Sequence, residues 1–295
     1  MERLDPLSLL SRNDKWYLGG GGRLLWAPPF PVFLDRPGFW DKAHYYNLEF
    51  QPLFTWTLLD EQGCEIELRS KLRDWTPARV RQRFSPPLAG VAVEEQKCVL
   101  PNDVACSRVT LKNRSRKPLQ LHFVAWTAQG TYPSKHSTWL TDVEHRDGEI
   151  AFDKHIRQGE RPEFRFSAVF GVKAKTKSFA INLSEGSLPS PQWKLTPFYE
   201  QFSRRKLSNS IKLQGINSDG LLFMALHATV TVKPGQQVPI DVALAAATSV
   251  HEARQNLRVA FESESPIRLS EMNWNDHFSS VPYFECSDQY LTHYY

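Results

Sequence analysis

Carboxylates and aromatic side chains meet in one proline-rich segment, Pro28 to Asp41, whose prolines fix the path of the chain. Asp35, Phe39, Trp40 and Asp41 are its candidates for contact with a ligand or a neighbouring domain. Sugar-binding surfaces use aromatic faces against C–H groups and carboxylates against hydroxyls. An exposed apolar loop is also typical of an interface. In a second interpretation, Trp40 fills the end of the folded core, and the residues alone leave both open.

Pairs of carboxylates are the pattern that glycoside hydrolysis requires, and none here has a credible arrangement. Glu94 and Glu95 are adjacent, so in a strand their side chains point to opposite faces. Glu285 and Asp288 stand at a predicted helix start, where the helix dipole favours acids for structural reasons. We therefore predict no catalytic residue within this chain.

Composition bounds the possible ligands and the compartment. The four cysteines form no Cys-x-x-Cys pair and no zinc-type cluster with histidine, so we expect no metal and no cofactor. Free thiols are typical of a reducing compartment, and the first residues do not form a signal peptide, which together predict a cytoplasmic protein. No apolar run is long enough to span a membrane. The 36 basic and 32 acidic residues are interspersed, which argues against a nucleic-acid partner.

Period-two alternation of apolar and polar residues is the dominant pattern, and it predicts half-buried strands. The clearest segments are 119–125, 164–172, 179–183, 222–232 and 238–246. Strands with one apolar face suit two packed antiparallel sheets, which we place over roughly Gly19 to Ala247. Lys233-Pro-Gly-Gln236 has turn chemistry and predicts a hairpin, and the basic segment Lys112 to Lys117 predicts a second one.

Helix signals appear only late in the chain. Ser249 and Glu252 form a capping box, so a helix is expected from Ser249 to about Phe261. Residues 263–277 look like a linker with some helix, and Ser287 begins another helical pattern. The predicted fold is mainly β: a large two-sheet antiparallel sandwich with a C-terminal helical linker.

Several segments together resemble a known family. They are Leu34–Asp41, Asn113–Leu121, Lys233–Ala253 and Trp274–Asp288 with the tyrosine-rich residues 290–295. They resemble the N-terminal domains of six-hairpin glycosidases, most nearly the glycoside hydrolase family 63-like and amylo-α-1,6-glucosidase-like enzymes. The resemblance covers nearly the whole chain, and the last segment is the most specific.

This resemblance implies a β-supersandwich over residues 1–262, then a helical linker and the truncated first helix of an (α/α)6 barrel over 263–295. The family's catalytic acid and base lie in the barrel, so the chain would be an accessory domain without activity of its own. Its partner would be an oligosaccharide or the (α/α)6 catalytic domain. Tyr290 and Tyr294 match an aromatic helix that lies near the sugar site in such enzymes.

Two other functions remain open from the sequence. The segment around Trp40 would suit a stand-alone carbohydrate-binding β-sandwich module. A protein-interaction sandwich with no role in sugar chemistry is the third possibility. Titration with oligosaccharides separates the binding module from the other two.

Overall fold

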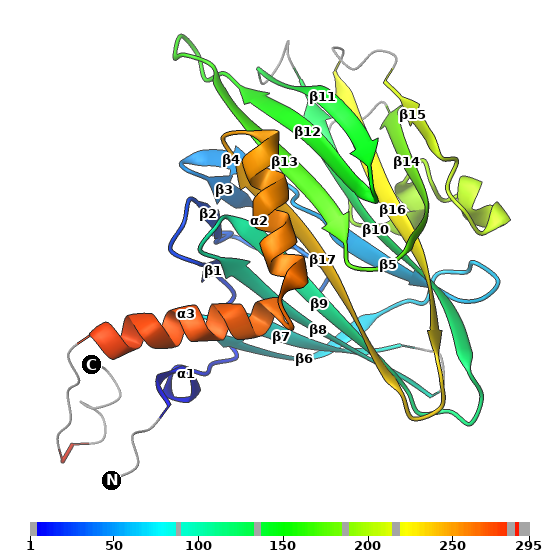
Figure 1. Cartoon of the computed structure of the whole chain (residues 1–295), viewed down its shortest axis with the longest axis horizontal. Coiled ribbons are helices and arrows are strands. Elements are labelled where there is room, and N and C mark those ends of the chain that lie inside the picture. Colours follow the sequence, from blue (N-terminus) through cyan, green and yellow to red (C-terminus); the bar gives the residue numbers. More distant parts are fainter. Residues whose placement is uncertain are drawn as a thin grey trace.

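A computed structural model describes residues 5–86, 90–132, 137–184, 189–213, 219–281 and 287–288. Of the described residues, 50% lie in strands and 15% in helices, which confirms a mainly β fold with a short helical region near the C-terminus. Two large sheets pack against each other, and a small third sheet lies beside them (Figure 1).

The first large sheet has five strands, and three of its four strand pairs are antiparallel. In order they are β15 (Ser210–Lys212), β14 (Thr176–Ser184), β16 (Gly220–Val232), β10 (Leu119–Thr131) and β5 (Thr55–Leu59). Only β15 runs parallel to the strand beside it. The long central pair of β10 and β16 is in register along its whole length, which fixes the inward face of this sheet.

The second large sheet has eight strands, all antiparallel to their neighbours. In order they are β11 (Thr138–Arg146), β12 (Glu149–Ile156), β13 (Phe164–Val172), β17 (Gln237–Ala247), β9 (Val104–Asn113), β8 (Val91–Leu100), β7 (Arg79–Ser85) and β6 (Arg69–Thr76).

The third sheet comes from the N-terminal region and was not predicted. It consists of β1 (Leu18–Gly19), β2 (Leu24–Trp26), β3 (Ala43–Tyr45) and β4 (Leu48–Phe50). Strands of two or three residues are too short to show a period-two pattern.

Both predicted hairpins are wrong in their pairing. The turn at Lys233–Gln236 joins β16 to β17, and the basic segment joins β9 to β10, but each joins a strand of one large sheet to a strand of the other. The two connections lie side by side, because Asn113 N donates to Gln236 O and Gly235 N donates to Asn113 O. Alternation shows which face of a strand is apolar, but it does not show which strand is its partner.

The main core lies between the large sheets. Phe123 and Leu226 from the five-stranded sheet and Phe170 and Leu244 from the eight-stranded sheet belong to one buried cluster. A second cluster covers the opposite face of the five-stranded sheet, where Trp193 and its neighbours pack. Both faces of that sheet are therefore buried, although the alternation predicted only one.

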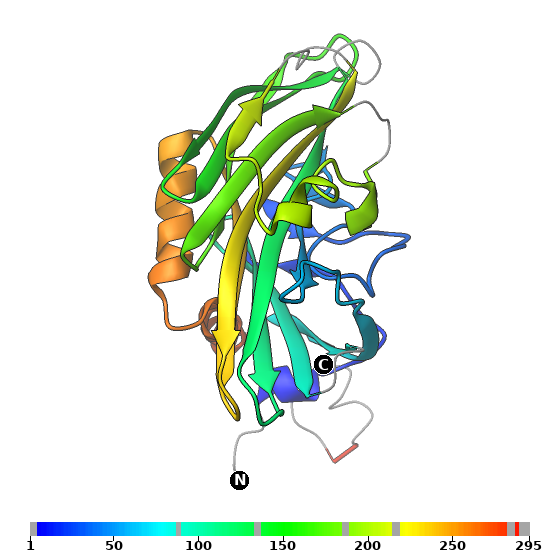
Figure 2. The same cartoon turned by 90° about the vertical axis from the view of Figure 1, so that its right-hand side faces the viewer.

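The helices are α1 (Pro6–Leu9), the 3-10 helices η1 (Trp193–Leu195) and η2 (Gln201–Arg204), α2 (Val250–Glu262) and α3 (Pro266–Ser280). Helices α2 and α3 pack on the outer face of the eight-stranded sheet, and Figure 2 shows α2 on one side of the sheets with η1 and η2 on the other.

The predicted helix from Ser249 matches α2, where the Ser249 hydroxyl accepts from Glu252 N. The segment predicted as a linker with some helix contains one helix, α3, which is capped by Ser265 and has Pro266 in its first turn. The helix predicted from Ser287 falls outside the described residues except for its first two positions.

Candidate functional site

The aromatic rings of the predicted loop are part of the core. Phe39 is 0% exposed and Trp40 is 1% exposed. The Phe39 ring packs edge-on against Trp26 and Phe54, and the Trp40 ring packs edge-on against Trp126 with ring centroids 5.0 Å apart. These rings are therefore not offered to a ligand in this conformation. Phe39 lies in the main core between the large sheets, whereas Trp40 lies in the second cluster, on the outer face of the five-stranded sheet.

The two acids of the loop differ in their surroundings. The Asp41 carboxylate is buried and accepts from the backbone N–H groups of Val32 and Phe33 at 2.8 and 2.9 Å, so it holds the loop in shape. The Asp35 side chain is 77% exposed, with an oxygen 3.6 Å from Arg73 Nη1. Of the four candidates in this loop, Asp35 is the one left at the surface. Tyr290 and Tyr294 lie outside the described residues.

A buried acid and a buried base fasten the tip of this loop. Glu95 Oε1 accepts from Gly38 N at 2.9 Å, from Trp56 Nε1 at 2.7 Å, and from the Ser107 hydroxyl. Lys97 Nζ donates to Gly38 O at 3.0 Å. Lys97 is 1% exposed, and burial lowers the pKa of its ammonium group. Two side chains of strand β8 therefore hold the backbone of Gly38: Glu95 binds its N–H group and Lys97 binds its carbonyl.

Glu95 belongs to a line of polar residues on the inner face of the eight-stranded sheet, which we name the inner polar row: Arg73, Gln82 and Glu95. Arg73 pairs with Gln82 across β6 and β7, and Gln82 pairs with Glu95 across β7 and β8. Gln82 and Glu95 are both 0% exposed. Arg73 Nε, Gln82 Nε2, Gln82 Oε1 and Glu95 Oε2 have no hydrogen-bond partner in the described structure.

The inner polar row was missed in the sequence, although a signal was present. In β7, Val80, Gln82 and Phe84 share the inward face, so an amide interrupts an apolar stripe. Glu94 and Glu95 point to opposite faces of the strand, as predicted: Glu94 pairs with Arg83 at the surface, while Glu95 points inward.

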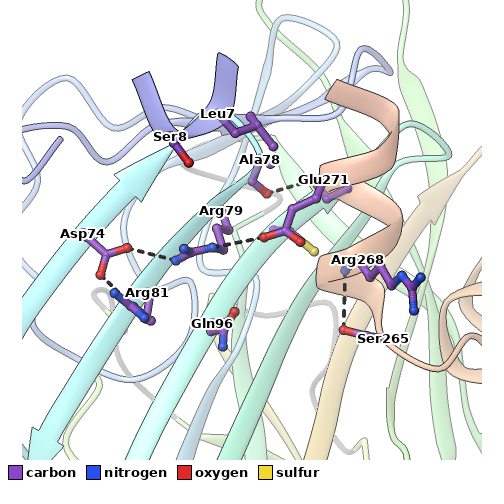
Figure 3. A network of polar contacts seen from close by, with 12 residues as sticks. Leu7, Ser8, Asp74, Ala78, Arg79, Arg81, Gln96, Ser265, Arg268 and Glu271 are labelled. Atoms are coloured by element: carbon purple, nitrogen blue, oxygen red, sulfur yellow. Dashed lines mark hydrogen bonds and ion pairs between the residues drawn. The ribbon is translucent and has the colours of Figure 1, made fainter. Parts of the chain in front are cut away.

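An open cleft lies on the other face of the sheet, between α1, α3 and the β6–β7 pair (Figure 3). Its volume is about 540 Å³. The lining is mostly polar and comprises Asp5, Leu7, Ser8, Ser11, Thr76, Arg79, Glu271 and Asn275. This cleft was not predicted, because its lining residues come from three widely separated segments of the chain.

A chain of ion pairs crosses the floor of this cleft. The Asp74 carboxylate accepts from Arg79 Nη1 at 2.9 Å and from Arg81 Nε at 2.7 Å, while Arg79 Nε donates to Glu271 Oε1 at 3.2 Å (Figure 3). The Ser270 hydroxyl also donates to the carbonyl of Ala78. Each charged group faces a group of opposite sign. These ion pairs hold α3 on the sheet. A catalytic acid has to exchange protons during the reaction, so the paired carboxylates of Asp74 and Glu271 are better explained as structural.

A third polar group lies on the outer face of the five-stranded sheet. His122 Nδ1 is 3.0 Å from His227 Nε2, and His227 Nδ1 is 2.9 Å from the Ser178 hydroxyl, which accepts from Leu207 N. The ring of Phe202 in η2 packs edge-on against both histidines. Burial lowers the pKa of His122, and burial with the nearby His122 charge lowers the pKa of His227 to about 4. Both imidazoles are therefore neutral near pH 7.

Two further observations concern the described residues only. Within them, no group of three His, Cys, Asp or Glu side chains is placed to hold a metal ion. No helix among them combines the length and the apolar character that a membrane crossing requires.

No protein-family model matches the chain, and the search of curated proteins finds no match either. Among solved structures, the chain is similar to a bacterial glucoamylase in complex with acarbose, with a TM-score of 0.52 and 7% identity. That similarity covers 90% of this chain and 37% of the glucoamylase. A second similar structure is a family 92 inverting mannosidase from Bacteroides thetaiotaomicron (TM-score 0.44, 9% identity), with 93% of this chain and 34% of that one covered. The chain thus spans about a third of each enzyme's length, and the first similarity shows a shared sandwich fold.

Proposed function

We propose that this chain is the N-terminal β-supersandwich domain of a carbohydrate-processing glycoside hydrolase whose catalytic acid and base lie in a separate (α/α)6 barrel. One observation carries the proposal. The glucoamylase similarity covers 90% of this chain but only 37% of that enzyme, which is the relation expected if this fold is one domain of a longer protein. The sequence resemblance to six-hairpin glycosidases supports the same role.

The placement of α3 supports a rigid accessory domain. Besides the Arg79–Glu271 ion pair, Arg108 donates to the carbonyl of Glu264 just before the helix, and Asn273 Nδ2 donates to the carbonyl of Gly20. A barrel joined after α3 would therefore have a defined orientation to the sandwich. We place the sandwich domain at residues 1–262 and the linker with the first barrel helix at 263–295.

A cytoplasmic location is part of the proposal. Cys98 and Cys106 are direct partners across β8 and β9, are both buried, and are both free thiols. Neighbouring cysteines without a disulfide are typical of proteins in a reducing compartment.

The experiment is to sequence the coding DNA on the 3′ side of the Tyr295 codon, together with the next reading frame. The proposal expects a coding region for repeated amphipathic helices with two separated carboxylates, in either frame. A neighbourhood without such a region would contradict the accessory role. The stand-alone sugar-binding module would then be the better hypothesis.

A further inference from the structure

An open groove crosses the outer face of the eight-stranded sheet, and we name it the basic groove. Its volume is about 930 Å³, and its described lining comes from strands β6, β7, β8, β9 and β17 and from the ends of these strands. Helix α3 packs on the opposite end of β7 and β8, near the β6–β7 turn, where Ser270 binds the carbonyl of Ala78 (Figure 1). None of the described residues that line the basic groove belongs to a helix, so this end of the sheet face is open to solvent.

The basic groove collects most of the excess positive charge of the chain. Its charged side chains are four cations and one acid: Lys71, Arg83, Lys112, Arg114 and Glu94. Four minus one leaves a net charge of +3 in the groove, against +4 for all 295 residues. Arg83 pairs with Glu94, and the other three cations have no ion-pair partner within the described part of the chain. The groove therefore has positive charge that the protein itself does not neutralise.

The register of the strands places cations on both sides of a low floor. Ala92 on β8 is directly opposite Lys112 on β9, and the neighbouring row places Glu94 between Arg83 and Thr110. Strands β7 and β9 flank β8, so their backbones are roughly 10 Å apart. Long cationic side chains on β7 and β9 therefore face each other across β8, which is low at Ala92.

The parts of the groove are held in place by hydrogen bonds. Arg83 Nε donates to Glu94 Oε2 at 2.9 Å, and Gln96 Nε2 donates to Glu94 Oε1 at 3.1 Å. The backbone N–H of Arg114 donates to the carbonyl of Gly90, which ties the segment after β9 to the start of β8. A site whose backbone and side chains are already ordered loses less conformational entropy when a ligand binds.

The lining residues select a ligand that carries both negative charge and hydroxyl groups. Lysine and arginine attract anions, and Ser85, Thr110 and Gln237 add neutral hydrogen-bonding groups. Among the described lining residues the one aromatic ring is Phe84, which is 5% exposed and packs against Trp56 in the core. No ring is therefore offered for stacking on a neutral sugar, and affinity has to come from charge and hydrogen bonds.

We propose that the basic groove binds an acidic oligosaccharide, a chain of sugars that carry carboxylates. Lys71 and Arg83 on one side, with Lys112 and Arg114 on the other, would contact carboxylates of different sugars along the chain. Hydroxyls between the carboxylates would bind the neutral polar side chains. The choice of a sugar over an acidic peptide rests on the proposed carbohydrate role. The accessory role does not require this groove, so it can hold even if the groove binds no glycan.

The test is isothermal titration calorimetry of the purified chain with trigalacturonic acid in low salt. Maltotriose, which has three sugars and no carboxylates, is the neutral control, and poly-L-glutamate represents an acidic polypeptide. We expect saturable heat with trigalacturonic acid, none with maltotriose and weaker binding of poly-L-glutamate. High salt should weaken the binding of trigalacturonic acid, because it screens charges at the surface.

Lys112→Met tests the site itself, since it removes one cation and keeps an unbranched side chain of similar length. Lys112 has no ion pair to lose, so the variant should melt like the parent, and we expect about fivefold weaker binding. Lys206→Met is the matched control, because it removes the same charge from an exposed position beyond η2, on the side of the five-stranded sheet. It should bind like the parent.

Four results would overturn the proposal. The first is no binding of trigalacturonic acid by the parent, which would leave the groove as a solvated basic face. The second is equal binding of maltotriose, and the third is tighter binding of poly-L-glutamate, which would assign the groove to an acidic protein. The fourth is an equal loss of affinity in Lys112→Met and Lys206→Met, which would show an effect of net charge only. None of these results decides the accessory role, which the coding DNA after the Tyr295 codon tests separately.

Discussion

Acidification should destabilise the fold through His227. Its pKa is about 4 in the folded chain against an ordinary value of 6.5. The unfolded chain therefore binds more protons between these two values, and stability falls as the pH decreases through this window. From pH 7.5 to pH 4.5, this one group should lower the free energy of unfolding by about 2.5 kcal/mol. His122, whose pKa is also lowered by burial, acts in the same direction.

The assay is urea unfolding at a series of pH values, followed by tryptophan fluorescence, for the parent and for His227→Asn. The variant loses the Ser178 hydrogen bond and is less stable at pH 7.5, but its stability should change less between pH 7.5 and pH 4.5. His251→Asn removes an exposed histidine and serves as the control. Equal pH dependence in the parent and His227→Asn would refute this reasoning.

Two further predictions test the loop and the helix clamp. Gly38 and Gly235 both have φ of +75°, but a Cβ at Gly38 would lie 2.5 Å from Phe54 O while a Cβ at Gly235 meets nothing within 4 Å. Gly38→Ala should therefore cost about 2 kcal/mol more than Gly235→Ala in urea unfolding, and equal losses would contradict the packing of the loop. Arg79→Met leaves Glu271 without its partner and Asp74 with Arg81 alone, so amide hydrogen exchange in α3 should become faster by roughly tenfold or more. Arg268→Met, which removes an exposed pair with Glu264, should leave this exchange unchanged.

The sequence predicted those parts of the fold that depend on local pattern. The alternation over 164–172 has the same bounds as β13, and the Ser249 capping box marks the start of α2. Strand partners were not predictable in this way, because pairing is decided by tertiary packing. For this reason two turns with good hairpin chemistry join strands of different sheets. The strands of the small third sheet are too short to be predicted from alternation, and their apolar side chains pack into the main core.

The candidate site was predicted less well, for a physical reason. Aromatic residues in a proline-rich loop can either form a binding surface or pack into the core. Only the folded structure shows that Phe39 and Trp40 are buried. Arg73, Gln82 and Glu95 become neighbours only through the register of strands β6, β7 and β8. That register could not be predicted from the local sequence. The position of Gln82 between the inward-facing Val80 and Phe84 was the one local indication of a polar group in the core.

The most direct test of the accessory role is an activity assay on the purified chain. It would be incubated with maltose, longer α-linked glucose oligomers and aryl α-glucosides, and the products would be separated by chromatography. Catalysis of this kind needs two carboxylates that flank the scissile bond. We expect no turnover above the buffer blank. Hydrolysis that disappears when a single acid of this chain, such as Glu271, is changed to the amide would contradict it.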